Sequence, residues 1–142
     1  MATKREQILA KVKTNLTGTV GVGTRIFRSR TSAFARSETP SLVIEFVTDE
    51  PRENSATIQK LDWTLRVRIV VVVRSETPDT TADATVESLH TKMVTDPTLG
   101  GLSIDVRPST TTFDIFEADQ VAGIVTCDFE IDYRSDYNDL SI

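Results

Sequence analysis

The residues of this chain that could do nucleophilic chemistry are few, and its single histidine and single cysteine come first. His90 and Cys127 would have to carry any Cys/His or Ser/His/Asp system. His90 stands beside Leu89 in a stretch of helical periodicity with no flanking nucleophile motif, and Cys127 falls on the apolar face of a strand pattern. We therefore predict a histidine at a helix surface or core edge, a packing cysteine and no nucleophilic enzyme site.

Two further groups could bind an ion or a phosphate. Asp128, Glu130 and Asp132 share one strand face, which spaces them along a line, whereas Ca²⁺ prefers the oxygens of a curled loop. Zinc needs three or four Cys/His ligands, and this chain has one histidine and one cysteine. The stretch 18–23, GTVGVG, lacks the Lys-Ser/Thr of a P-loop and follows a helix pattern, where the dinucleotide fingerprint follows a strand. The sequence predicts no metal, no cofactor and no catalysis, hence a structural or binding protein.

Charge is unevenly distributed along the chain. The net charge is −5, yet residues 1–36 hold eight basic residues and Glu6 alone, for +7, which leaves −12 for the remainder. A basic arm of this kind could contact nucleic acid, or the basic end of one copy could meet the acidic end of another. Only Phe27 and Phe34 are interleaved with the arginines, and this disfavours nucleic-acid binding as the main task.

Composition predicts one globular domain over 1–142. Hydrophobic residues are 39% and charged residues 26%, as in ordinary soluble proteins. The lone cysteine cannot form an internal disulfide, so nothing suggests an oxidising compartment. The first residues, MATKREQILAKVK, lack the apolar core of a signal peptide, and no stretch is long and apolar enough for a membrane span. We expect cytoplasm-like conditions and no membrane partner.

The first half of the chain predicts a helix and two strands. Thr3 and Glu6 form a capping box, the apolar stripe Ile8, Leu9, Val12 and Leu16 follows, and the helix should end before Gly18. Residues 24–40 predict a short strand and then a long, mobile, Arg-rich loop. Residues 41–48, SLVIEFVT, alternate as a strand that directs Leu42, Ile44 and Phe46 to one face.

The second half is dominated by two long strands. The first should span about 58–74, with one apolar face at 65, 67, 69, 71 and 73, and the second 121–133, with one apolar face at 125, 127, 129, 131 and 133. Between them we predict a helix capped by Thr80 or Asp79 and stopped at Asp96-Pro97, then two short strands at 103–108 and 113–116. The polar tail 135–142 is expected to fray.

This order predicts an α+β fold: a mostly antiparallel or mixed β-sheet with two α-helices packed on one face, and a long strand or hairpin extending from the body. Arg66 and Arg68 should lie across from Asp128, Glu130 or Asp132, since a one-residue slip would put the acids in the core. Val70 and Val72, on the same side as the arginines, are expected to be buried against the helices, with the extended strand covered by another copy.

Several stretches, taken together, resemble the tail terminator (tail completion) proteins of long-tailed bacteriophages. The likeness spans nearly the whole chain. It lies in the opening helix, the Arg-rich loop RIFRSRTSAFARSETPSLVIEF with Pro40, and the long Trp-bearing strand with alternating arginines. It continues in the helix closing on HTKMVTDPTLGGL, with its Asp96–Leu102 turn, and in the acidic strand CDFEIDYRSD.

The resemblance implies a virion structural protein without enzymatic activity. Six copies would form a ring on the head-proximal end of the tail tube, stop tube polymerisation and present a surface to the head connector. Its partners would be itself, the tail tube protein and the connector or neck protein, with DNA passing through the channel without specific binding. We expect assembly in the host cytoplasm. The residues expected to contact partners, or to line the channel, are Arg25, Arg28, Arg30, Arg36, Arg66, Arg68, Asp128, Glu130 and Asp132.

Three alternatives stay open at this point. A head–tail joining or neck protein of the same particle belongs to the same class. A small α+β ligand-binding or enzymatic domain that works as a dimer would need an apolar pocket. Nucleic-acid binding through the basic first quarter would show an affinity that falls steeply with salt.

Overall fold

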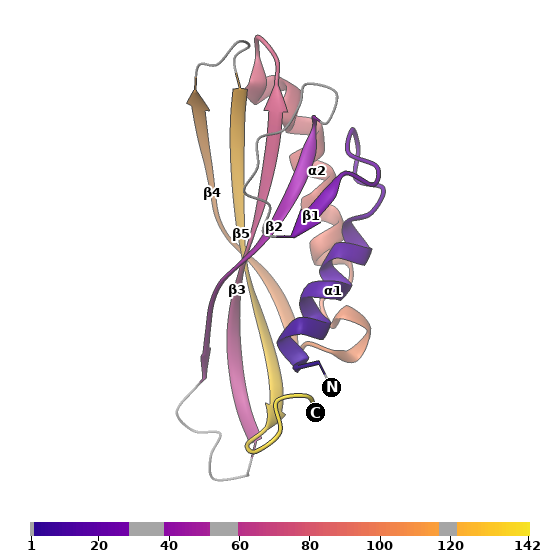
Figure 1. The fold of residues 1–142 in the computed structure, drawn as a ribbon, viewed down its shortest axis with the longest axis vertical. Helices are drawn as coiled ribbons and strands as arrows, with labels where there is room; N and C mark the ends of the chain where they lie inside the picture. Colours follow the sequence, from indigo (N-terminus) through magenta and orange to yellow (C-terminus); the bar gives the residue numbers. More distant parts are fainter. Residues whose placement is uncertain (1, 29–38, 52–59, 117–121) are drawn as a thin grey trace.

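The structure, a computed structural model, describes residues 2–28, 39–51, 60–116 and 122–142 (Figure 1). It contains two α-helices, one short 3₁₀ helix and five β-strands within these ranges. Along the chain they are α1 (Lys4–Leu16), β1 (Ile26–Arg28), β2 (Ser41–Pro51), β3 (Lys60–Arg74), α2 (Pro78–Thr95), η3 (Leu99–Gly101), β4 (Asp105–Phe116) and β5 (Ala122–Asp136).

The strands form one mixed sheet in the order β1-β2-β3-β5-β4. β1 is parallel to β2, and every other neighbouring pair is antiparallel. Both helices lie on the same side of the sheet (Figure 1), and no helix of the described residues covers the other side, which we call the helix-free face. The predicted α+β class, with two helices on one face of a mostly antiparallel sheet, is confirmed.

The core lies between the helices and one face of β3 and β5. All five predicted apolar positions of each strand are buried, among them Ile69, Phe129 and Ile131. They pack in one cluster with Ile8 and Leu16 of α1 and with residues of α2. Burying each large aliphatic or aromatic side chain contributes about 1.5–3 kcal/mol, so this continuous layer is the main source of stability.

The predicted start of α1 is confirmed for Thr3 only, because the Glu6 carboxylate pairs with Arg28 instead of closing the capping box. The start of α2 differs from the prediction. Thr3 Oγ1 accepts a hydrogen bond from the Glu6 backbone N–H at 3.2 Å, which satisfies one free donor of the first turn of α1. The prediction that Thr80 or Asp79 caps the second helix was wrong. Pro78 is already the first helical residue, and Thr77 is the cap without a side-chain hydrogen bond. Proline suits this position because its missing N–H would have no helical partner there.

The long strand β3 is central, and this corrects two expectations. It extends past the start of α1 in Figure 1, but it is paired with β2 and with β5 rather than left for another copy to cover. Val70 and Val72 lie on the helix-free face and are half-buried, so they are not packed under the helices. The helices cover the face of β3 that carries the odd-numbered residues 65–73. Because side chains alternate along a strand, the even-numbered residues must lie on the other face.

Two further predictions about the end of the chain were wrong. Residues 105–116 form one continuous strand with a register irregularity between Pro108 and Thr111, not two short strands. Pro108 is tolerated because β4 is an edge strand. The tail does not fray: the Leu140 carbonyl accepts a hydrogen bond from the Lys4 backbone N–H at 2.6 Å and so caps α1.

Candidate assembly surface

The helix-free face of the sheet carries a band of charged side chains across its strands. The predicted register is confirmed: Arg66 pairs with Glu130 and Arg68 with Asp128 across β3 and β5. Arg68 Nε donates to Asp128 Oδ1 at 3.1 Å. We call the following set the charged ladder: Arg66, Arg68, Asp105, Arg107, Asp128, Glu130 and Asp132.

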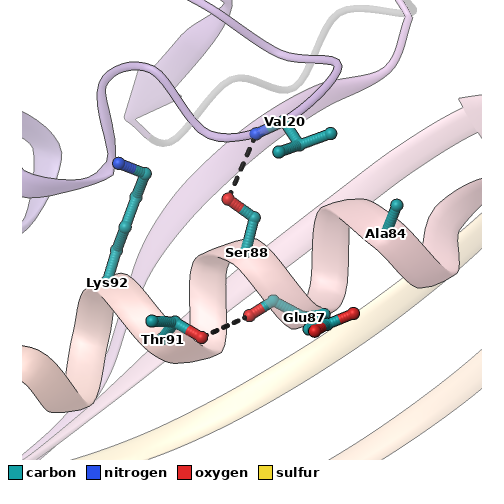
Figure 2. Close-up of a pocket in the computed structure, with 6 residues that line it drawn as sticks. All are labelled: Val20, Ala84, Glu87, Ser88, Thr91 and Lys92. Carbon is teal, nitrogen blue, oxygen red and sulfur yellow. Dashed lines mark hydrogen bonds between the residues drawn. The ribbon is translucent and has the colours of Figure 1, made fainter.

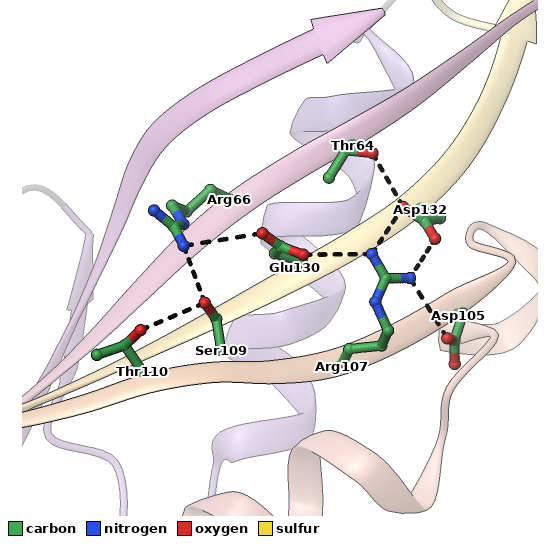
Figure 3. A network of polar contacts seen from close by, with 8 residues as sticks. All are labelled: Thr64, Arg66, Asp105, Arg107, Ser109, Thr110, Glu130 and Asp132. Atoms are coloured by element: carbon green, nitrogen blue, oxygen red, sulfur yellow. Dashed lines mark hydrogen bonds and ion pairs between the residues drawn. The ribbon is translucent and has the colours of Figure 1, made fainter. Parts of the chain in front are cut away.

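Arg107 of β4 is the centre of this ladder (Figure 3). Its guanidinium donates to both carboxylate oxygens of Asp132 and to Glu130 at 3.3 Å, and it lies 3.5 Å from Asp105. Glu130 is in turn 3.7 Å from Arg66. Hydrogen bonding to Asp132 raises the pKa of Arg107 further above its ordinary value, so this cation is permanent. Sequence reasoning missed Arg107, although the alternation Asp105-Val106-Arg107 was a signal for it.

The acids of the ladder are mostly neutralised within the chain. Asp128 and Asp132 each expose only 10% of their side chains, and each is bonded to an arginine. Three arginines face four carboxylates in the ladder, so the set carries a net charge close to −1. The strongly acidic surface that Asp128, Glu130 and Asp132 suggested in the sequence is therefore a compensated one.

Beyond Arg68, toward Val72 of β3, most side chains of the helix-free face are apolar or threonine instead of charged. One row runs across all five strands through Phe27, Val43, Val70, Thr126 and Thr112. The next row adds Val72 opposite Ile124. This face is therefore apolar and Thr-rich in one half and ionic in the other.

The two described arginines of the predicted partner loop are both engaged inside the chain. Arg25 donates to the Pro40 carbonyl at 2.9 Å and to the Gly21 carbonyl at 2.5 Å. Arg28 forms a bidentate pair with Glu6 of α1, at 2.6 and 3.0 Å, which lowers the pKa of that carboxyl. Arg30 and Arg36 lie outside the described residues, as does most of the predicted mobile loop.

The nucleophile candidates are placed as the sequence predicts. His90 is exposed on α2, with its ring 6.2 Å from that of Phe129. Cys127 is buried in the core, and burial raises the pKa of its thiol, which favours the unreactive protonated form. Neither environment activates a nucleophile.

The glycine-rich loop at 18–23 uses its donors internally. The Gly18 and Gly23 amides bond to the Gly23 and Thr19 carbonyls at 2.9 and 3.1 Å, and the Val20 amide bonds to Ser88 Oγ at 3.2 Å. A phosphate cradle needs such amides free. The loop instead forms one wall of a shallow groove of about 430 Å³ over α2 (Figure 2), lined by Val20, Ala84, Glu87, Ser88, Thr91 and Lys92.

A cluster that the sequence did not indicate lies on the helix-covered face of the sheet, near the end of β2 and the start of β3. Tyr133 donates to Asp49, Arg5 lies 3.6 Å from the same carboxylate, and Trp63 stacks on Tyr133 with ring centroids 6.2 Å apart. Asp49 Oδ1 is buried and accepts no hydrogen bond within the described part of the chain. Desolvation raises the pKa of Asp49. A register shift within β2, between Phe46 and Thr48, turns Asp49 to the helix-covered face, where it pairs with Leu65 of β3.

Neither a membrane-spanning helix nor a metal site occurs among the described residues. None of the helices there is long and apolar enough to cross a membrane. Those same residues contain no group of three or more His, Cys, Asp or Glu side chains arranged to hold a metal ion.

Comparison with known proteins gives one informative result. No family model and no curated protein matches the chain. Among solved structures, a chain described as "Virion of native gene transfer agent (GTA) particle" has a similar fold, with a TM-score of 0.62 and 11% sequence identity. The match covers 89% of this chain and 94% of that one, so the likeness extends over the whole domain and establishes the fold.

Proposed function

We propose that this chain is a tail terminator: a virion structural protein that forms a ring on the head-proximal end of the tail tube of a long-tailed, phage-like particle. The observation that carries the proposal is the fold likeness to a chain of a virion particle, which is almost complete in both directions at 89% and 94% coverage. The order of elements that resembled tail terminators in the sequence is consistent with it.

The proposed mechanism is competition for the growing end of the tube, without catalysis. One face of the ring pairs with the last ring of tube protein. The opposite face cannot template another tube ring and instead meets the head connector. Assembly takes place in the host cytoplasm, and the finished ring stays in the virion.

Within this proposal, the helix-free face of the sheet is the candidate channel lining or subunit seam. Its ladder pairs Arg66 with Glu130, Arg68 with Asp128 and Arg107 with Asp132. It therefore offers DNA neither a continuous basic track nor an unpaired acidic wall. Passing DNA would make few phosphate contacts on such a surface, which suits sliding. Arg30 and Arg36 remain candidates for partner contact, and Arg25 and Arg28 would act by fixing where that segment begins.

The test combines a measurement of the molecular mass of the assembly with an assay for capping of tail tubes. Light scattering over a wide concentration range, with negative-stain images of the largest species, should show a hexameric ring. Purified tail tubes incubated with the protein should acquire a cap at one end and stop elongating in tube protein. Binding to empty heads but not to tubes would identify a head–tail joining protein instead. A stable dimer that binds neither tail tubes nor empty heads, and that binds a small molecule in a pocket, would refute the virion role.

A further inference from the structure

The outer side of β4 is unusually apolar for an exposed sheet edge. β4 is one end of the strand order, so the outward main-chain groups of this long strand face away from the sheet. Phe113 and Ile115, near its end, expose 43% and 58% of their surface. An exposed apolar edge strand favours association with another chain, and proteins that remain monomeric usually protect such edges.

Acidic side chains of α2 flank the same edge. Asp79, Asp83 and His90 follow each other at helical spacing on one exposed stripe. His90 lies next to Phe129 of β5, and the opposite flank of α2 bonds to Val20 next to α1, so this stripe faces the β4 side. Phe113 and Ile115 lie on the helix-covered face of β4, the same side as α2. We call the following set the β4 flank: Asp79, Asp83, Phe113 and Ile115.

The opposite end of the sheet has the complementary charge. β1 is the other terminal strand, with α1 beside it (Figure 1). Three basic side chains, Lys13, Arg25 and Arg28, lie at this end with one acid, Glu6, which Arg28 already pairs. Lys13 is exposed on the α1 stripe that contains Glu6. We call the following set the β1 flank: Glu6, Ala10, Lys13, Arg25 and Arg28.

We propose that the β4 flank of one copy binds the β1 flank of the next copy, so that the two ends of the sheet form a heterologous subunit contact. The occupant of the apolar edge is thus a second copy of this chain. Two different, complementary surfaces on opposite ends of one subunit are what a closed ring requires. The inference rests on the proposed function for its biological setting. The contact itself should form between copies of the purified protein, without tail tubes or any other partner.

The experiment uses charge reversal on each flank and then a mixture. Asp79→Lys/Asp83→Lys and Ala10→Glu/Lys13→Glu are each expected to weaken self-association at least about tenfold, because like charges then meet across the contact. An equimolar mixture should recover assembly, since each reversed flank finds a complementary one on the other variant. Sedimentation velocity measures all three samples, and circular dichroism checks that each variant is folded.

Matched controls separate this contact from general surface effects. Ile115→Asp should dissociate the assembly, whereas Ile104→Asp, at an equally exposed isoleucine before β4, should not. Lys92→Glu, in the groove on the flank of α2 that faces the loop at 18–23, should also leave it intact. The proposal is overturned if the wild-type chain is monomeric at all concentrations, if both reversed variants assemble normally, or if the mixture fails. If assembly follows the predicted pattern but tail tubes are never capped, the contact stands and the tail-terminator function fails.

Discussion

Replacing Arg107 with methionine should destabilise the fold more than any other single change in the charged ladder. Methionine preserves much of the side-chain length and removes only the charge and the donors. Asp132 would then keep Thr64 as a partner at 3.1 Å but lose its guanidinium, although only 10% of its side chain is exposed. Glu130 and Asp105 would lose a shared cation as well.

The magnitude lies between two known limits. Exposed ion pairs contribute about 0.2–1 kcal/mol, and removing one partner of a fully buried pair costs about 3–5 kcal/mol. Arg107 is 41% exposed while Asp132 is nearly buried, so we expect a loss of about 2 kcal/mol, between the limits of exposed and buried pairs. Arg66→Met is the matched control: Arg66 and Glu130 are 37% and 36% exposed, and the loss should stay within about 0.5 kcal/mol.

Urea unfolding followed by circular dichroism measures both losses. All variants must be compared at one low protein concentration, because self-association would add to the apparent stability. The midpoint should fall for Arg107→Met with an unchanged slope. Equal losses for the two variants, or no loss for Arg107→Met, would refute the argument that burial of Asp132 sets the strength of the network.

Two further predictions concern the core side of the sheet. Because desolvation raises the folded-state pKa of Asp49 above its usual 3.8, this carboxyl's contribution to stability grows as pH falls through that raised value, is complete below 3.8 and is lost as pH rises. Asp49→Asn should therefore remove a pH dependence at and just above 3.8; parallel melting-temperature profiles for variant and wild type would contradict this. Gly123→Ala should cost about 1–3 kcal/mol by overpacking, since the added Cβ would lie 2.4 Å from Pro78 Cβ. Adding Pro78→Ala should recover part of that loss in thermal unfolding, and no recovery would locate the strain elsewhere.

The sequence was most informative where the physical constraint is strict. Strand alternation, with every second residue apolar, identified the core-facing sides of β3 and β5, because a slip by one residue would turn Asp128 and Asp132 toward the apolar core under the helices. The same constraint gave the pairing of Arg66 and Arg68. The Thr3 cap was equally local and correct, whereas the Glu6 half of the predicted capping box was lost to a pairing with Arg28 from a distant segment. These features depend on neighbours along the chain or on one pair of strands.

Features that depend on the complete strand order could not be obtained in this way. Val70 and Val72 look like core residues, but which face the helices cover is settled only by the whole fold. The continuity of β4 was hidden by Pro108, and Arg107 became important only once β4 was placed beside β5. Asp49 faces the core side of the sheet because of a register shift in β2, and the neighbouring residues in the sequence do not indicate that shift.

The strand order also constrains how the chain can be made. β5 is the last strand in the sequence, yet it lies between β3 and β4. Until it emerges from the ribosome, both of those strands present an unpaired edge, and the apolar positions of β3 have no neighbour on that side. Such intermediates aggregate readily. A nascent chain that stalls before residue 122 should therefore need chaperones or be degraded, whereas loss of the short edge strand β1 should be far easier to survive.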